Sequence, residues 1–321
     1  MDPILSLDIG GTKIAAALLT RHGDLLAARR APSLADQGPD RMIDRLLELC
    51  RELAAETGTD LRSAGISCGG PLDPVKGIVL NPPNLPGWDR TPLRAMIADG
   101  LDLDPRRVHL ENDANAGALA ELRFGAARGR RHAIFLTMST GIGGGLILDG
   151  RLYRGATSNA GEVGHQVVLP GGPLCGCGNR GCLEAVASGS GIAARLQDRF
   201  HTLSPRLRQA AGADGRLTAE HLIQAVRDGD GSAIEFFEET VTLLARGIAN
   251  LVFVINPEIV ILGTIGWHAG PTLLDSLREQ VGRMCWPVLT AGLEIVASPL
   301  GLRLEQLSGL AVALEAEADA P

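Results

Sequence analysis

The sequence has few aromatic residues, no excess of positive charge and no long apolar run, and each absence excludes a class of protein. Aromatic residues make up 3% of the 321 residues, which is too few for the stacking surface of a single-strand nucleic-acid binder. The net charge of −7 also argues against a nucleic-acid partner. The longest apolar stretch, around 248–255, falls short of the roughly 20 residues of a membrane helix. We therefore expect neither a nucleic-acid nor a membrane partner.

The first residues also lack a secretory signal, because the apolar run 4–9 is short and has no basic start. A cytoplasmic location is therefore expected. Six cysteines are present, and Cys175, Cys177 and Cys182 lie within eight positions of one another. In a cytoplasmic chain such clustering favours a metal site over disulfides.

The order of apolar runs predicts two α/β halves built on one plan. A length of 321 residues corresponds to roughly two domains. In the first half we predict strands at 4–9, 14–19, 25–28, 64–67 and 108–111. Helices are predicted at 42–53 and from about residue 92. In the second half we predict strands at 133–138, 145–148 and 259–262, with long helices across 187–256. Residues 198–215 are expected to be a surface connection, and 305–318 a helix that returns to the first domain.

Two glycine-rich turns follow apolar strands in corresponding places of the two halves. The first contains Gly10, Gly11 and Thr12, and the second runs from Thr140 to Gly145. Glycine lets backbone amides approach a phosphate closely, although either turn alone is equally consistent with an ordinary tight hairpin. Neither turn matches the P-loop or the dinucleotide-binding pattern. The pair, with Asp8 leading the first turn, favours two phosphate-binding hairpins.

One imidazole and three thiols lie within eighteen residues and predict a zinc site. His165, Cys175, Cys177 and Cys182 are enough for a closed tetrahedral site, in which no position is left for a catalytic water. We therefore expect structural zinc. Glu162 and Glu184 flank the cluster, and they are either solvated surface groups or carboxylates that the metal site holds in place.

Asn112 and Asp113 stand where a predicted strand ends and a helix begins. Residues of these types at such a junction are often helix N-caps. The ends of strands are also where open α/β sheets place their ligands. Asp113 could therefore accept a proton from a substrate hydroxyl, with Asn112 orienting that substrate.

Taken together and in order, these motifs resemble the ROK family of bacterial sugar kinases and sugar-responsive repressors. The resemblance extends from residue 8 to about 190 and continues weakly through Asn256-Pro257 and Gly263. It is carried by the segments 8–13, Asn84-Leu85-Pro86-Gly87-Trp88, 111–116, 140–145, 161–165 and 175–184.

The resemblance implies an actin-like (ribonuclease H-like) two-domain sugar kinase fold of class α/β. Such a fold has a duplicated βββαβα core, and ATP and sugar bind in the cleft between the domains. The implied smaller domain comprises 1–113 plus 304–321, with the first phosphate loop and the catalytic Asp. The implied larger domain comprises 114–303, with the second phosphate loop and the zinc knuckle.

The resemblance also implies a role for each matching residue. Asp113 matches the catalytic base. The implied sugar contacts are Gly70, Asn84, Asn112, Asp113, Glu162, His165 and Glu184. The implied nucleotide contacts are Asp8, Gly10, Gly11, Thr12, Lys13, Thr140, Gly141 and Gly263, with Asp8 also helping to hold Mg²⁺. His165 would serve both zinc and sugar.

Three positions depart from the family's usual pattern, namely Gly69, Ser139 and Thr264, and we expect an altered nucleotide affinity from Ser139 and Thr264. The predicted activity is ATP-dependent phosphorylation of a hexose, with glucose favoured and N-acetylmannosamine or N-acetylglucosamine as alternatives. A non-catalytic sugar sensor of the same family is the alternative of another class. Only seven residues precede Asp8, which disfavours an N-terminal DNA reader. A homodimer or homotetramer is compatible with the family.

Overall fold

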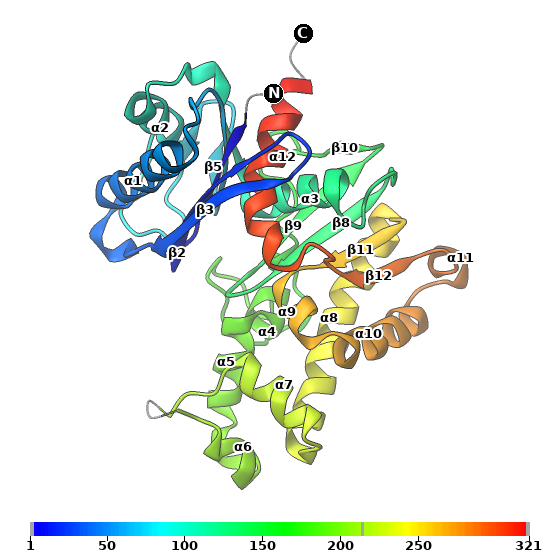
Figure 1. The fold of residues 1–321 in the computed structure, drawn as a ribbon. Helices are drawn as coiled ribbons and strands as arrows, with labels where there is room; N and C mark the ends of the chain where they lie inside the picture. The colour runs from blue at the N-terminus through cyan, green and yellow to red at the C-terminus, as the bar shows by residue number, and fades with distance from the viewer. Residues whose placement is uncertain (1–2, 213–214, 319–321) are drawn as a thin grey trace. The chain divides into compact units, whose positions relative to one another are not determined.

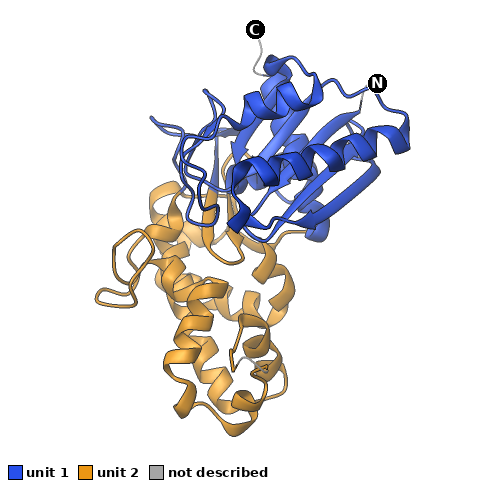
Figure 2. Ribbon diagram, turned by 90° about the vertical axis from the view of Figure 1, so that its left-hand side faces the viewer, with its two compact units in different colours: residues 1–129, 145–161, 300–321 blue, residues 130–144, 162–299 orange. Residues whose placement is uncertain are grey.

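The computed structural model describes residues 3–212 and 215–318, and the chain folds into two compact units. Unit 1 comprises 1–129, 145–161 and 300–321, and unit 2 comprises 130–144 and 162–299 (Figure 2). The domain boundaries predicted from the sequence differ from these units in the segments 114–129, 145–161 and 300–303. Those boundaries remain a prediction.

Unit 1 is built on a mixed five-stranded sheet in the order β3-β2-β1-β4-β7. Its strands are β1 (Ile4–Ile9), β2 (Lys13–Leu19), β3 (Leu25–Pro32), β4 (Ala64–Cys68) and β7 (Val108–Asn112). The first three strands form an antiparallel meander, and β4 and β7 then add in parallel to β1. The carboxyl ends of β1, β4 and β7 therefore meet at one edge of the sheet.

Helices cover both faces of this sheet (Figure 1). The unit 1 helices are α1 (Pro39–Thr57), α2 (Leu93–Leu101), α3 (Asp113–Phe124) and α12 (Leu304–Ala318). The buried core on the α1 and α2 face contains Leu5, Leu7 and Ile9. On the opposite face the Ser6 hydroxyl accepts a hydrogen bond from the α12 amide of Leu310 at 3.1 Å. The predicted helix 305–318 thus packs against the N-terminal sheet.

The second sheet repeats the plan of the first, in the order β10-β9-β8-β11-β12. Its strands are β8 (Ala133–Met138), β9 (Ile142–Leu148), β10 (Arg151–Leu152), β11 (Ile259–Leu262) and β12 (Glu294–Ala297). The pair β9–β10 is antiparallel, and β8, β11 and β12 are parallel. The same strand order in both sheets confirms the duplicated plan. A small separate hairpin joins β5 (Leu72–Asp73) to β6 (Ile78–Val79).

Helices make up most of the rest of unit 2. They are α4 (Leu183–Ala187), α5 (Gly189–Asp198), α6 (Pro205–Gln209), α7 (Ala219–Arg227), α8 (Gly231–Ile255), α9 (Thr264–Ala269), α10 (Pro271–Met284) and α11 (Pro287–Thr290). Helix α6 lies in the segment predicted to be a surface connection. The Ser204 hydroxyl accepts from the Leu207 amide at 3.0 Å, and Pro205 opens the helix. A serine followed by proline is a helix-start signal that the sequence prediction missed.

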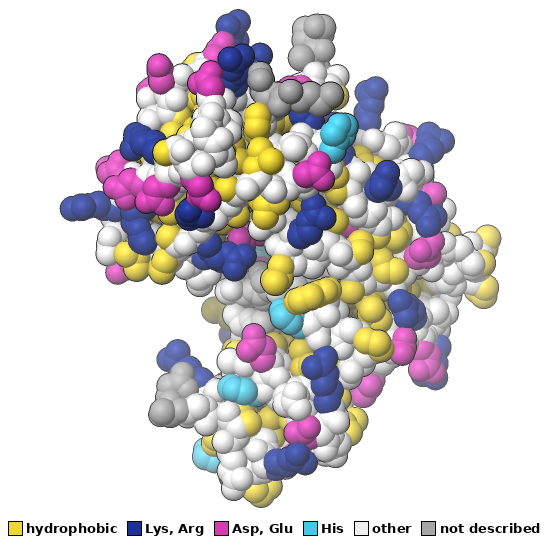
Figure 3. Space-filling view, viewed as in Figure 1, with side chains coloured by type: hydrophobic (Ala, Val, Ile, Leu, Met, Phe, Trp, Pro, Cys, Tyr) yellow, Lys and Arg dark blue, Asp and Glu magenta, His cyan; other side chains and the backbone are white. Residues whose placement is uncertain are grey.

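The surface agrees with the charge balance of the sequence. Lys and Arg side chains lie among Asp and Glu on the face shown in Figure 3, without a continuous basic area. Within the described residues, no helix combines the length and the apolar character needed to cross a membrane.

Candidate functional site

A row of polar side chains crosses three adjacent strands of unit 1 near their carboxyl ends. Asp8 of β1 is in register with Ser67 of β4, and Ser67 is in register with Glu111 of β7. Side chains at matching positions of neighbouring strands point to the same face of a sheet. The Ser67 hydroxyl donates to Asp8 Oδ1 at 3.0 Å. Strand pairing thus brings together groups that are about fifty residues apart in the sequence.

The environment of Asp8 disfavours its charged form. Burial, together with a smaller contribution from the Glu305 carboxylate of α12, raises the pKa of this carboxyl to about 7. The Ser67 hydrogen bond and the Lys13 ammonium act in the opposite direction. A divalent cation at Asp8 would offset this cost, which fits the predicted role of this residue in holding Mg²⁺.

Replacing Asp8 with Asn is expected to stabilise the protein at pH 8 in the absence of Mg²⁺ and nucleotide. Because the pKa of Asp8 is raised from 3.8 to about 7, the folded protein between these pH values keeps a proton that the unfolded chain releases. The stability of the wild type therefore falls as pH rises through this range. The stabilisation that comes from the proton on Asp8 in the folded state is lost above about pH 7. The variant should gain up to about 4 kcal/mol at pH 8 and little at pH 4.5. Urea unfolding at both pH values measures this difference.

The exposed Asp44 in α1 provides the control for that experiment. Asp44→Asn makes the same chemical change at an exposed position outside the site. An Asp8→Asn variant whose stability follows the wild type at every pH would show that Asp8 ionises normally.

Asn112 and Asp113 form the start of α3. Asn112 Oδ1 accepts from the amides of Ala114 at 2.9 Å and Asn115 at 3.3 Å, so this side chain is the helix N-cap. Its amide group faces Gly70, where an added Cβ would stand 3.0 Å from Nδ2. The cap uses the carbonyl oxygen of Asn112, and the NH₂ group is the part suited to the predicted sugar contact.

Asp113 is exposed at the first position of α3, and its Oδ1 accepts from the Ala114 amide at 2.8 Å. The partial positive charge of a helix N-terminus favours the ionised carboxylate. The Asp113 charge also contributes to the raised pKa values of Asp8 and Cys68, which places it near the ends of β1 and β4. An exposed carboxylate in this position can accept a proton.

The first glycine-rich turn joins β1 to β2 directly after Asp8. The Gly10 amide donates to the Lys13 carbonyl at 3.0 Å. Gly11 packs so closely on the segment that contains Asn84 that a Cβ would lie 2.7 Å from the Asn84 carbonyl oxygen. Glycine is therefore required at position 11, and the predicted nucleotide turn contacts a predicted sugar residue within unit 1.

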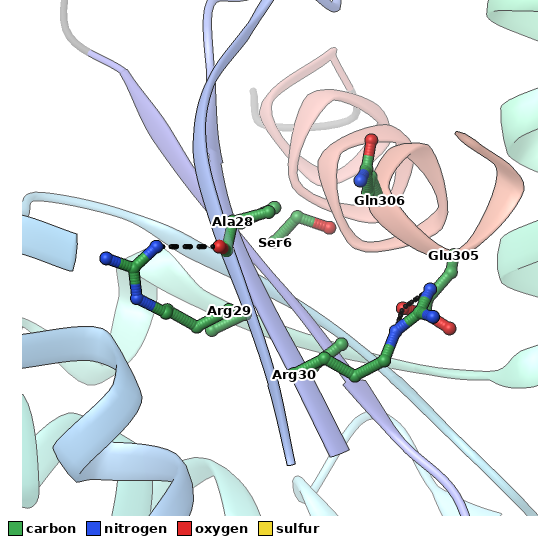
Figure 4. Close-up of a pocket in the computed structure, with 9 residues that line it drawn as sticks. Ser6, Ala28, Arg29, Arg30, Glu305 and Gln306 are labelled. Carbon is green, nitrogen blue, oxygen red and sulfur yellow. Dashed lines mark hydrogen bonds and ion pairs between the residues drawn. The ribbon is translucent and has the colours of Figure 1, made fainter. Parts of the chain in front are cut away.

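The Lys13 ammonium forms an ion pair with Glu305 of α12, a residue that the sequence analysis did not single out. Glu305 also pairs with Arg30 of β3 at 2.8 Å. This second pair borders a groove of about 250 Å³ between the sheet and α12 (Figure 4). None of the residues with a predicted role lines that groove, so we assign it no ligand.

In unit 2 the four predicted zinc ligands lie in one cluster. One ligand atom from each of His165, Cys175, Cys177 and Cys182 lies within 4.8 Å of the other three. Cys175 Sγ is 3.5 Å from His165 Nδ1, and Cys177 Sγ is 3.7 Å from Cys182 Sγ. Zinc bonds of about 2.0 to 2.3 Å at tetrahedral angles give edges of about 3.5 to 3.8 Å. The residues present therefore fit a tetrahedral zinc ion.

His165 presents its two ring nitrogens to different partners. Nδ1 faces the sulfur atoms, and Nε2 lies 3.8 Å from a Glu162 carboxylate oxygen. With Nδ1 on a metal, Nε2 carries the proton and becomes a hydrogen-bond donor. This geometry is compatible with the dual role in metal and sugar binding that the family resemblance implies for His165.

Glu184 lies two residues after the last cysteine ligand, in α4. Its Oε2 accepts from the Ile142 amide at 3.0 Å. A Cβ at Gly141 would stand 2.4 Å from the same carboxylate oxygen, so the Glu184 side chain packs directly on this turn. The predicted sugar residue Glu184 therefore contacts the predicted second phosphate turn.

The second turn is also held by the start of α5. The Gly189 amide donates to the Ser139 carbonyl at 2.8 Å, and the Ser190 hydroxyl donates to the Thr140 carbonyl at 2.6 Å. Gly263 follows β11, which pairs in parallel with β8, and its amide donates to the Leu136 carbonyl at 2.8 Å. Thr140, Gly141 and Gly263 therefore follow the carboxyl ends of neighbouring strands.

Four residues of this site were given no role from the sequence. They are Ser67, Glu111, Glu305 and Arg154, whose Nε donates to Glu111 Oε2 at 2.7 Å. Ser67 and Glu111 are polar residues within otherwise apolar strands, a signal that could have been used. No local pattern identifies Arg154 or Glu305, because the partners with which they pair are distant in the sequence.

The chain is similar to known proteins over most of its length. A family model described as the ROK family matches residues 4–301. A glucokinase of Thermotoga maritima is 38% identical over 300 residues, which is 92% of each chain. An N-acetylmannosamine kinase of Escherichia fergusonii is 36% identical over 260 residues, or 81% of each chain.

A solved structure supports the same relation. The ROK family glucokinase from Streptomyces griseus, in complex with glucose and AMPPNP, is 31% identical and has a TM-score of 0.81. The match covers 97% of this chain and 98% of that chain. This similarity confirms the two-domain α/β fold that the sequence predicted.

Proposed function

The chain belongs to the ROK family, and on this premise we propose that it is an ATP-dependent sugar kinase that converts glucose to glucose 6-phosphate. The observation that carries the proposal is the exposed Asp113 carboxylate at the start of α3. It lies near Asp8, which leads into the first glycine-rich turn. The similarity to a glucokinase over 92% of each chain supports the choice of glucose. The glucose and AMPPNP in the Streptomyces griseus structure support the pair of substrates.

In the proposed reaction the oxygen of the sugar 6-hydroxyl attacks the γ-phosphorus of ATP. Asp113 accepts the proton of this hydroxyl as the attack proceeds. A new oxygen–phosphorus bond forms, the bond from the γ-phosphorus to the bridging oxygen breaks, and ADP leaves. General-base assistance of this kind contributes about 10² to 10⁴-fold to the rate. The Ala114 amide of helix α3 orients the carboxylate for this step.

The remaining predicted residues bind and orient the two substrates. In unit 1 the sugar contacts are Gly70, Asn84 and the NH₂ group of Asn112, and in unit 2 they are Glu162, His165 and Glu184. The turn Gly10–Lys13, the turn Thr140–Gly141 and Gly263 bind the nucleotide, and the Lys13 ammonium supplies positive charge for its phosphates.

Two metals belong to the proposal. Asp8 would hold Mg²⁺, which neutralises phosphate charge when it is bound with ATP. The cluster of His165 and three cysteines would hold zinc in a structural role, because its four protein ligands complete the tetrahedron.

Coupled measurement of ADP release with Mg²⁺ and a panel of sugars tests the function. The panel contains glucose, mannose, fructose, allose, N-acetylglucosamine and N-acetylmannosamine, and glucose is expected to give the highest kcat/KM. If an acetylated sugar gave the highest kcat/KM, the proposed substrate would change from glucose to that sugar and the proposed mechanism would stay the same. The similarity to an N-acetylmannosamine kinase, at 36% identity, makes this the alternative to test. Sugar binding without turnover would refute the kinase proposal in favour of a sugar sensor.

A further inference from the structure

A buried ion pair joins the strand that leads to Asp113 with a distant part of unit 1. The Glu111 side chain is only 2% exposed, and its Oε2 accepts from Arg154 Nε at 2.7 Å. Arg154 follows β10 and is itself about one third exposed. No role for either residue follows from the sequence motifs.

The second oxygen of Glu111 holds the start of α3. Oε1 accepts from the Asn112 amide and from Asn115 Nδ2, each at 3.0 Å. These donors lie on either side of Asp113 in the sequence. The Glu111 carboxylate therefore fixes the backbone before Asp113 and the first helical turn after it.

Burial of the Glu111 carboxylate carries a desolvation cost that its partners must offset. Glu111 is a buried charged residue of β7, and the buried Val108 and Leu110 of the same strand are apolar and point to the opposite face of the sheet. Replacing a buried ion pair with apolar residues is often neutral or stabilising, whereas removing one partner leaves an uncompensated charge. The start of α3 already has its cap in Asn112. The Glu111 hydrogen bonds therefore act on a helix start that is already capped, and they hold residues on both sides of Asp113.

We propose that Glu111 and Arg154 are positioning residues that set the orientation of Asp113 for proton transfer. This inference rests on the proposed kinase function. Arg154 also orders its own segment, because its carbonyl accepts from the Ala160 amide at 3.0 Å. Through Arg154, the segment 154–161, which leads to the predicted sugar residue Glu162, is attached to the same point as Asp113.

Steady-state kinetics of three variants test the proposal, with the sugar that the wild type prefers. Arg154→Met should lower kcat by about 10- to 100-fold and leave the KM for ATP within about threefold, because a small displacement of a catalytic group has an effect of this order. The double variant Arg154→Met/Glu111→Gln should recover at least threefold in kcat. Its glutamine side chain can still accept from Asn112 and Asn115, and no buried charge remains. The exposed Arg151 of β10 gives the matched control, and Arg151→Met should behave as the wild type.

Circular dichroism and thermal unfolding establish that each variant is folded before its kinetics are compared. A folded Arg154→Met variant with kcat within threefold of the wild type would overturn the proposal. So would a double variant that is no more active than Arg154→Met, or an equal loss in Arg151→Met. A wild type that phosphorylates no sugar would instead remove the proposed function, and this inference with it. The activity of the wild type therefore separates the two failures.

Discussion

Asp113→Asn is expected to lower kcat by about 10³-fold while the affinity for sugar stays within a few-fold of the wild type. The Asn side chain keeps the shape of Asp and can still accept the hydrogen bond from the Ala114 amide, so the start of α3 is preserved. It cannot take up the proton of the attacking hydroxyl. The chemical step is therefore expected to fail, whereas ground-state binding is retained.

The measurement combines kcat from ADP release with sugar affinity from isothermal titration calorimetry. The exposed Asp99 in α2 supplies a control, because Asp99→Asn makes the same chemical change away from the site. Full turnover by Asp113→Asn would eliminate this residue as the base. A loss of affinity as large as the loss of kcat would instead assign it to binding.

Cys177→Ser is expected to remove zinc and to weaken sugar binding at least tenfold. The cluster contributes three sulfurs and one imidazole, and a structural zinc of this type supplies about 10 to 16 kcal/mol of apparent binding energy in isolated peptides. Without the metal, the orientation of His165 and the position of Glu184, two residues after Cys182, lose their support. Both residues are proposed sugar contacts.

Zinc per chain, measured by plasma mass spectrometry, and sugar affinity should fall together in this variant. Cys285 is buried in unit 2 outside the cluster, so Cys285→Ala controls for the loss of a cysteine and should keep its zinc. A Cys177→Ser protein that still holds one zinc per chain would show that Cys177 is not a ligand. Zinc-free protein with unchanged sugar affinity would separate the metal from the sugar site.

Features encoded by neighbouring residues could be predicted from the sequence. The strands 4–9, 133–138 and 259–262 were predicted with the bounds that the structure has, because an apolar run between turn residues defines a buried strand. The metal cluster was predicted from spacing, since four ligand residues within eighteen positions can close on one ion. Asn112 was predicted with two alternative roles, and the helix cap is the one that its carbonyl oxygen performs.

Other features depend on which segments the fold brings together. The register of β1, β4 and β7 aligns Asp8, Ser67 and Glu111, and no single segment specifies this register. The same holds for Arg154 with Glu111, 43 residues apart, and for Glu305 with Lys13, 292 residues apart. The sequence by itself determined the strands, the glycine-rich turns and the cluster of His165 with three cysteines, because local propensity and spacing encode them. Only the tertiary structure decided the surroundings of Asp8 and Asp113, because burial and charge at a site come from residues distant in the chain.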